Sequence, residues 1–335
     1  MEAKKETVLS GIRPTGNLHL GNYFGAVKQF DKMQHEYESY FMIADYHSLT
    51  THPNPKDLQS NVKQVLAEYL ACGLDVDNCT LFVQSTLPET AELYLLLAMH
   101  AYKGELERTA SFKEKARKQP ENVNAGLLTY PILMAADILI HRATKVPVGK
   151  DQEQHLEMTR DYGRRFNHIY DCQVFEEPTA FNFSNDLVKV PGLDGNTKMG
   201  KSESGNNAIF LVDDEKTILK KMKKAKTDNG PTQMNQEKPV EIENLFTISR
   251  LVNPETATYF EDAYNNMSIR YGEFKLALAA DIWTFVKPFH ERIADIRADE
   301  KLLDSVIEQG MVKAQESARK TLNLVRDAIG LKRIY

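Results

Sequence analysis

The chain has 335 residues, enough to bury a large core and long for one domain, so an α/β domain with a smaller second domain is expected. Its net charge of −5, with 42 basic and 47 acidic side chains, excludes a generic basic coat for nucleic acid, although a local basic patch could attract RNA. No apolar run approaches the ~20 residues that span a bilayer, and the first residues lack a signal-peptide core. The three cysteines, Cys72, Cys79 and Cys172, show no metal-binding spacing, which favours reduced thiols in the cytoplasm.

Strands alternate with helices over the first half of the chain. The pattern predicts a strand at residues 7–12, a helix at 22–34, a strand at 40–45, a helix at 55–72, a strand at 79–84, a helix at 89–102, a strand at 145–149 and a helix at 151–166. Two segments between them differ. Residues 104–123 are polar and predict a mobile connection, while residues 126–141 predict a buried helix, or two helices broken at Pro131. The alternation predicts an α/β fold with a Rossmann-like, doubly wound parallel sheet.

The pattern changes near residue 213, after which almost every segment is helical. The boundary falls in a stretch rich in glycine and asparagine at residues 192–207. We therefore expect one domain at residues 1–192 and an α-helical C-terminal domain at residues 193–335, whose last helix could pack back on the first domain.

The stretch PTGNLHLGN at residues 14–22 joins the first strand to the first helix. Gly16 and Gly21 have no Cβ, so backbone N–H groups can approach phosphate oxygens, and a helix N-terminus adds partial positive charge. His19 and Asn22 are three residues apart and can donate to the same phosphate. The alternative is an ordinary turn with a surface histidine. The dinucleotide fingerprint GxGxxG is absent, which argues against a nicotinamide enzyme.

A second stretch, TKMGKSESGN at residues 197–206, carries Lys198 and Lys201 around a Met199-Gly200 pair, followed by Ser202. A short loop with two ammonium groups can act as a mobile clamp on a polyphosphate. A lysine-rich loop alone is more often a solvated surface, so the pairing of the two stretches carries the interpretation.

Together the two stretches resemble the paired signatures of class I aminoacyl-tRNA synthetases, His-x-Gly-His/Asn and Lys-Met-Ser-Lys-Ser, in the expected order. The segments SGIRPTGNLHLGNY, ELERTASFKEK, AGLLTYPILMAADIL and VPVGKDQEQHLEMTRD are similar to the tryptophanyl-tRNA synthetase family in particular. The resemblance covers essentially the whole chain. It departs from the family at Gly200, where serine is usual; we expect activity to be retained because both lysines and Ser202 remain.

The resemblance implies a reaction and partners. L-Tryptophan and ATP would form tryptophanyl-adenylate and pyrophosphate, and the aminoacyl group would pass to the 3′-terminal ribose of tRNA(Trp). Mg²⁺ would travel on the ATP phosphates, with no dedicated metal site on the protein. The family is a homodimer, and the apolar helices at residues 90–142 could supply its interface. Residues 1–192 would be catalytic, and residues 193–335 would hold the lysine loop and the anticodon-binding helices.

The resemblance assigns residues on the ATP side of the site. The expected catalytic residues are His19, Asn22, Lys115, Lys198, Lys201 and Ser202. The expected ATP-binding residues are Arg13, Pro14, Thr15, Gly21, Asn22, Gly149, Lys150, Asp151, Val190, Lys198, Met199, Gly200, Lys201 and Ser202. Lys113 is an alternative to Lys115 for the leaving pyrophosphate, and for both the other interpretation is a solvated helix face. Asp151, after the fourth strand, is placed for the ribose hydroxyls.

An indole ring offers one N–H donor and a wide apolar face, so its pocket needs one buried acceptor and flat walls. The expected tryptophan-binding residues are Leu9, Gly11, His47, Tyr130, Met134, Asp137, Val146, Val148 and Gln152. By resemblance Asp137 accepts the indole N–H, Tyr130 and Gln152 bind the ammonium group, and His47 stacks on the ring. Core packing remains open for Met134 and the other apolar walls, an incidental loop position for His47, and a surface acid for Asp137.

Six lysines in EKTILKKMKKAKT, residues 215–227, predict a basic stripe that attracts tRNA phosphates, with a solvated helix face as the alternative. Other functions also remain open. A tyrosyl-tRNA synthetase would use Asp137 for a phenol hydroxyl, but its helix typically carries glutamine at the position of Met134. A nucleotidyltransferase of small metabolism shares the histidine signature but would not bind tRNA. A non-catalytic paralogue is disfavoured by the intact His19, Asn22, Lys198 and Lys201.

Overall fold

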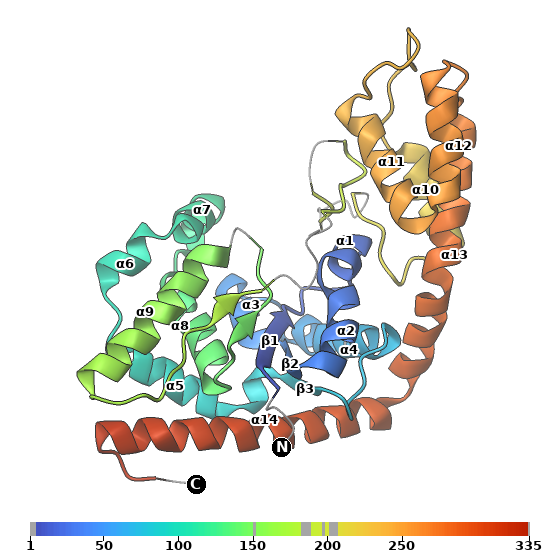
Figure 1. The fold of residues 1–335 in the computed structure, drawn as a ribbon. Helices are drawn as coiled ribbons and strands as arrows, with labels where there is room; N and C mark the ends of the chain where they lie inside the picture. The colour runs from blue at the N-terminus through green and yellow to red at the C-terminus, as the bar shows by residue number, and fades with distance from the viewer. Residues whose placement is uncertain (1–4, 150–151, 182–188, 196–197, 201–206, 334–335) are drawn as a thin grey trace.

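A five-stranded parallel sheet forms the centre of the molecule (Figure 1). The computed structural model describes residues 5–149, 152–181, 189–195, 198–200 and 207–333. The strands are β1 (Thr7–Ile12), β2 (Glu38–Ile43), β3 (Thr80–Val83), β4 (Lys145–Val146) and β5 (Thr179–Ala180), in the order β3-β2-β1-β4-β5. The chain builds outward from β1 to β3, then crosses to β4 on the other side. The strand order therefore reverses between β1 and β4, where open α/β sheets bind ligands at the carboxyl ends of their strands.

Helices cover both faces of the sheet. They are α1 (Leu20–Asn22), α2 (Lys28–Glu36), α3 (Asp45–Ser48), α4 (Pro55–Ala71), α5 (Pro88–Ala98), α6 (Lys103–Arg108), α7 (Ala110–Lys118), α8 (Ala125–Ile140), α9 (Glu153–Ile169), α10 (Glu215–Lys224), α11 (Val240–Val252), α12 (Pro254–Asn265), α13 (Tyr271–Ala298) and α14 (Glu300–Ile329). Successive strand residues serve opposite cores, because side chains alternate across a strand. In β1, Val8 joins the cluster with Phe30 and Tyr69 of α2 and α4, and Leu9 joins the cluster with α8 and α9. The expected doubly wound fold is confirmed.

The local structure differs from the expectation in several places. Residues 104–123 hold helices α6 and α7, and Ala110 N–H at the start of α7 donates to Gln154 Oε1 of α9 at 3.1 Å. Ala125–Ile140 form one continuous helix, α8, through the buried Pro131, which confirms the first of the two alternatives for this segment. The two-residue β5 was not predicted, because Thr179 and Ala180 are both exposed and show no alternation. A π-helical turn at Tyr23–Val27 also interrupts the predicted first helix.

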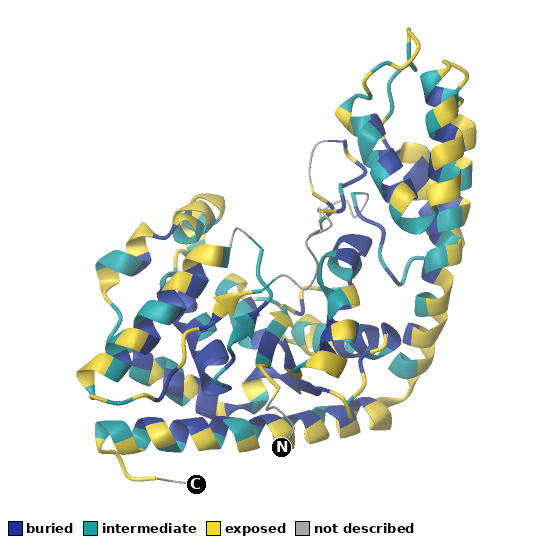
Figure 2. Ribbon diagram, viewed as in Figure 1, coloured by how far each residue is buried: buried dark blue, intermediate teal, exposed yellow. Residues whose placement is uncertain are grey.

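The helical part stands to one side of the sheet and is carried on the long helix α13 (Figure 1). After Asp299 the chain turns, and α14 runs back along the base of the sheet, where it packs on β3 and α5. Figure 2 shows buried and exposed residues alternating along α14, as an amphipathic helix on a core requires. Among the described residues, no helix is both long and apolar enough to cross a membrane.

Candidate active site

A cavity of about 830 Å³ opens beside the carboxyl end of β1, where the strand order reverses. Its wall includes these expected residues: Leu9, Gly11, Arg13, Thr15, Asn22, His47, Lys115, Tyr130, Met134, Asp137, Val146, Val148, Gly149 and Gln152. They come from β1 and the loop after it, the end of α1, α3, α7, α8, β4 and the segment after β4. The structure thus brings all nine residues of the expected amino-acid pocket and part of the expected nucleotide site to one cavity.

The histidine signature forms a reciprocal cap at the start of α1. His19 Nδ1 accepts the Asn22 backbone N–H at 3.2 Å, and Asn22 Oδ1 accepts the His19 backbone N–H at 3.1 Å. Because Nδ1 of His19 is an acceptor, a neutral ring carries its proton on Nε2 and can donate there. His19 is buried and lies behind the wall, whereas Asn22 lines the cavity. The cap therefore holds the two side chains in fixed orientations.

The lysine loop reaches the histidine signature through Met199. A Cβ on Gly21 would lie 2.9 Å from the His19 ring and 3.4 Å from Met199 Cβ, so glycine permits this close approach. Met199 N–H donates to Val190 O at 2.9 Å, and both side chains are buried in the core. The two signatures are therefore in contact.

Some expected residues do not line the cavity. Among the described ones these are Pro14, His19, Gly21, Val190, Lys198, Met199 and Gly200. Val190, expected at adenine, faces the core. Lys198 is exposed beside the bridge that joins it to Pro191. Lys150, Asp151, Lys201 and Ser202 lie outside the described residues, so their roles remain predictions.

Asp137 is the buried acceptor at the base of the cavity, with an exposure of 2%. His47 Nε2 donates to its Oδ2 at 2.9 Å, and Gln84 Nε2 lies 2.8 and 2.9 Å from its two oxygens. Burial raises the pKa of Asp137, and the hydrogen bond from His47 opposes that rise. The interpretation of Asp137 as a surface acid is wrong, and His47 is hydrogen-bonded to the carboxylate. The sequence reasoning missed Gln84, whose only signal is its place at the end of the third strand.

Lys115 lies against the aromatic face of Tyr130, with Nζ 3.6 Å from the ring centroid. Burial, and then repulsion from Arg13, lowers the pKa of Lys115 to about 8. Lys113, the alternative, is exposed and does not line the cavity. Of the two lysines, Lys115 is the one placed to meet a ligand in the cavity.

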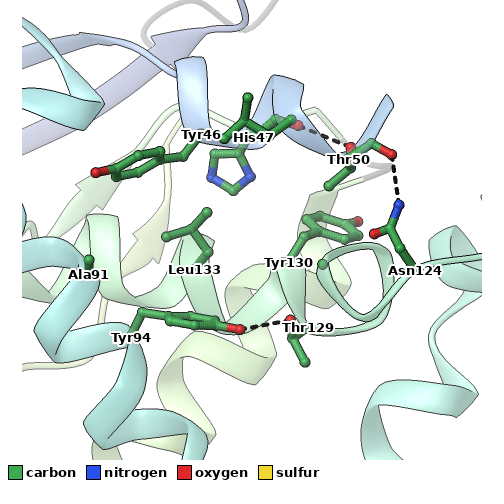
Figure 3. A pocket seen from close by; sticks show the side chains of 11 residues that line it. Tyr46, His47, Thr50, Ala91, Tyr94, Asn124, Thr129, Tyr130 and Leu133 are labelled. Carbon is green, nitrogen blue, oxygen red and sulfur yellow. Dashed lines mark hydrogen bonds between the residues drawn. The ribbon is translucent and has the colours of Figure 1, made fainter. Parts of the chain in front are cut away.

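Behind His47 and Tyr130 lies a second, apolar cavity of about 460 Å³ (Figure 3). Its other walls include Tyr46, Ala91, Tyr94 and Leu133, which converge from α3, α5 and α8. The Tyr94 and Thr129 hydroxyls are 2.9 Å apart at its rim. His47, Thr50 and Tyr130 line both cavities, so a substitution of one of these residues alters the wall of each.

The family model for class I tRNA synthetases (W and Y) matches residues 1–287. A tryptophan–tRNA ligase of Porphyromonas gingivalis is 61% identical over 98% of this chain and 100% of its own length. One from a Synechocystis strain is 42% identical over 97% of this chain and 98% of its own length. The crystal structure of a Campylobacter jejuni tryptophanyl-tRNA synthetase with ADP and tryptophan is 32% identical, covers 97% of this chain and 100% of that one, and superposes with a TM-score of 0.85.

Proposed function

Because the chain belongs to the class I tRNA synthetases of the tryptophan and tyrosine group, we infer that it attaches L-tryptophan to tRNA(Trp) with ATP. The observation that carries this inference is the relationship over the full chain to a tryptophan–tRNA ligase at 61% identity. The buried Asp137 in an apolar cavity agrees with it, since an indole needs one buried acceptor. The same relationship disfavours tyrosine as substrate.

In the first step, a carboxylate oxygen of tryptophan forms a bond to the α-phosphorus of ATP. The bond from that phosphorus to the bridging oxygen breaks, and pyrophosphate leaves with the electron pair. No covalent nucleophile on the protein is required, so catalysis consists of positioning and charge stabilisation. We propose that Asp137 accepts the indole N–H, that Tyr130 and Gln152 bind the ammonium group, and that Asn22 faces the phosphates while His19, behind the wall, holds it in place.

We propose that Lys198, Lys201 and Ser202 bind the phosphates of ATP, although Lys201 and Ser202 lie outside the described residues. The contact of Met199 with the histidine signature supports this, because it brings the start of the lysine loop to α1. Among the described residues and apart from its chain neighbours, only the Lys198 carbonyl oxygen lies near a would-be Cβ on Gly200, at 3.7 Å. The serine that is usual there would therefore fit, and its hydroxyl is what this chain lacks for a further phosphate contact.

We also propose that Mg²⁺ arrives on the phosphates of ATP. The described residues include no group of three or more His, Cys, Asp or Glu side chains that could hold a metal ion. Phosphate oxygens and water would then be its main ligands, as is usual for Mg²⁺ with a nucleotide. The ion would neutralise phosphate charge beside Lys115.

For tRNA binding we propose the outer face of α10. Lys216, Lys220, Lys223 and Lys224 are exposed there, whereas Lys221 is buried and pairs with Asp213 at 2.6 Å. Lys221 is therefore not part of the expected exposed stripe of six lysines. The others can attract phosphates without sequence specificity. We propose residues 193–335 as the tRNA-binding domain and residues 1–192 as the catalytic domain, with α14 bracing the two.

Charging of tRNA tests this function. Purified protein with ATP, Mg²⁺ and total bacterial tRNA should form aminoacyl-tRNA with labelled tryptophan. The acceptor should be tRNA(Trp) alone, and labelled tyrosine should give none. Formation of adenylate without transfer to any tRNA would contradict the second step, and would favour a nucleotidyltransferase.

The pKa of Lys115 predicts a pH dependence of ATP binding. ATP phosphates favour the charged lysine, so the KM for ATP should be lowest below pH 8 and should rise as the pH passes about 8. Lys115→Arg should remove this rise, because a guanidinium stays charged throughout the range. The measurement is the KM for ATP between roughly pH 6.5 and 9.5, with Lys113→Arg as control. An unchanged pH profile in Lys115→Arg would contradict the role.

We propose that two copies of the chain associate through the face around α5. Leu95 on α5 and Met99 at its C-cap, one turn apart, are 52% and 69% exposed, and Leu49 on the wall of the apolar cavity is 48% exposed. Such a patch on a stable fold indicates an interface. The double variant Leu95→Glu, Met99→Glu should sediment as a monomer. Leu276→Glu, on the helical part and 50% exposed, should leave the dimer intact. A monomeric wild-type protein would contradict the proposal.

Finally, we propose a cytoplasmic location. Cys72, Cys79 and Cys172 are all free thiols, and charging of tRNA takes place where the ribosome works. Burial raises the pKa of Cys79 to about 12 and also raises that of Cys72, so both are inert at neutral pH.

A further inference from the structure

A fully buried histidine, His155 on α9, touches both residues assigned to the tryptophan ammonium group. His155 has an exposure of 0%. Its Nδ1 lies 2.9 Å from Gln152 Oε1, and its Nε2 lies 2.6 Å from the Tyr130 hydroxyl. Nε2 is also 2.8 Å from the hydroxyl of Ser111 on α7. The residue was not among the expected site residues, although it follows Gln152 by three positions and so shares its helix face.

The partner at Nδ1 fixes the tautomer of the ring. An amide oxygen can only accept, so Nδ1 of His155 must carry the proton that it shares with Gln152. In the neutral ring Nε2 then has no proton and must itself accept. The two hydroxyls near it are therefore its donors, either directly or in series.

The hydroxyl of Tyr130 has its proton committed away from the cavity. It donates to Ser111 Oγ at 2.8 Å, and it also lies within reach of His155 Nε2. With the proton directed to Ser111 and His155, the phenol oxygen can turn only lone pairs toward a ligand. Tyr130 lines the large cavity, so the hydrogen-bond donor of a bound ligand would meet the phenol oxygen as an acceptor.

An ammonium group is a donor with no lone pair to offer, and it complements this arrangement. We propose that His155 is a positioning residue, which orients Tyr130 and Gln152 as hydrogen-bond acceptors for the α-ammonium group of the substrate. The proposal rests on the proposed tryptophan activation, since it concerns the same cavity. It explains why a histidine stands at a fully buried position between two polar side chains, where an apolar residue would pack without needing partners.

Because Nδ1 of His155 donates and Nε2 accepts, substitutions at this position differ in which of the two hydrogen bonds they keep. His155→Gln can place an amide oxygen near the position of Nε2, and so keeps the acceptor for Tyr130 and Ser111. His155→Asn can keep the donor to Gln152 near the position of Nδ1, but it removes the acceptor. His155→Phe removes both. If orientation of Tyr130 is what matters, the glutamine variant should be the least impaired.

The experiment is isothermal titration of the full-length protein with tryptophan and with 3-indolepropionate, which lacks only the ammonium group. His155→Asn and His155→Phe should bind tryptophan roughly ten- to a hundredfold more weakly, as expected for loss of a hydrogen bond to a charged group. His155→Gln should recover most of that affinity. All three variants should bind 3-indolepropionate within about twofold of the wild type. His141→Phe is the matched control, because His141 is also buried, at 4% exposure, but lines a different cavity.

Several results would overturn the proposal. Equal weakening for both ligands would mean that His155 only supports the fold, and so would a glutamine variant as weak as the asparagine variant. Unchanged tryptophan affinity in all variants would also reject it. The Gln and Asn variants decide the matter even if His155→Phe does not fold. If the wild type binds 3-indolepropionate but not tryptophan, the assignment of the ammonium site is wrong, and if it binds neither, the proposed function itself fails.

Discussion

Asp137→Asn should lower kcat/KM for tryptophan by roughly ten- to a hundredfold, because a hydrogen bond to a buried charged group is worth about 1.5–3 kcal/mol. The effect has a local cause. Both carboxylate oxygens of Asp137 accept from Gln84, and Oδ2 also accepts from His47. In Asp137→Asn, the new amide NH₂ would face the two N–H donors, Gln84 Nε2 and His47 Nε2. The one oxygen that remains at residue 137 could then not be held toward the indole N–H.

The measurement is tryptophan-dependent ATP–pyrophosphate exchange, run beside the benzothienyl analogue of tryptophan, which has sulfur in place of the indole N–H. The wild type should strongly prefer tryptophan, and Asp137→Asn should lose most of that preference. Asp45→Asn is a suitable control, since Asp45 is buried nearby but bonds the backbone of Tyr46 and Ser85 and does not line the cavity. A preference that survives in Asp137→Asn would remove Asp137 from indole recognition.

Gly310→Ala should destabilise the fold by about 3 kcal/mol or more, although alanine is the better helix former. A Cβ at Gly310 would lie 1.6 Å from the carbonyl oxygen of Leu81 and 2.6 Å from its carbonyl carbon. Both neighbours are backbone atoms of β3, so no side-chain rotation can relieve the overlap. The helix α14 would have to move away from the strand, and the packing around Val306 and Ala314, both buried on α14, would open with it.

Thermal and denaturant unfolding followed by circular dichroism would show the loss. Gly272→Ala is the matched control: it lies in a helix of the same chain, but among the described residues no atom beyond its own helix backbone and chain neighbours comes within 4 Å of its would-be Cβ. That variant should be as stable as the wild type, or slightly more stable. If Gly310→Ala unfolds at the same temperature as Gly272→Ala, the close contact of α14 with β3 does not exist in solution.

The sheet could be predicted from local pattern, because strand alternation and turn residues are adjacent in sequence. The ends of β1 were predicted to the residue, and β2 and β3 to within two residues. The two-residue β5 carries too little pattern to detect. Helix α7 was missed because its sequence is polar throughout, and the residues that line the cavity, Ser111 and Lys115 among them, show no apolar periodicity.

The site was predictable where one segment supplies several of its residues. Tyr130, Met134 and Asp137 share one helix face and line one cavity. Contacts between distant segments were not predictable. Gln84 reaches Asp137 across 53 residues, and Ser111 reaches His155 across 44. Lys221 looked like one lysine of a stripe, but Asp213 and a backbone carbonyl draw it into the core. The need for glycine at position 310 could not be predicted from the sequence, because it arises only from the close approach of the β3 backbone.

The central claim is that this chain activates tryptophan with ATP. Amino-acid-dependent exchange of pyrophosphate into ATP tests it most directly, with each standard amino acid assayed separately. Exchange is expected with tryptophan alone, and Lys115→Ala should lose that exchange. Exchange with tyrosine would contradict the assignment of the Asp137 pocket, and absence of exchange with every amino acid would contradict the function itself.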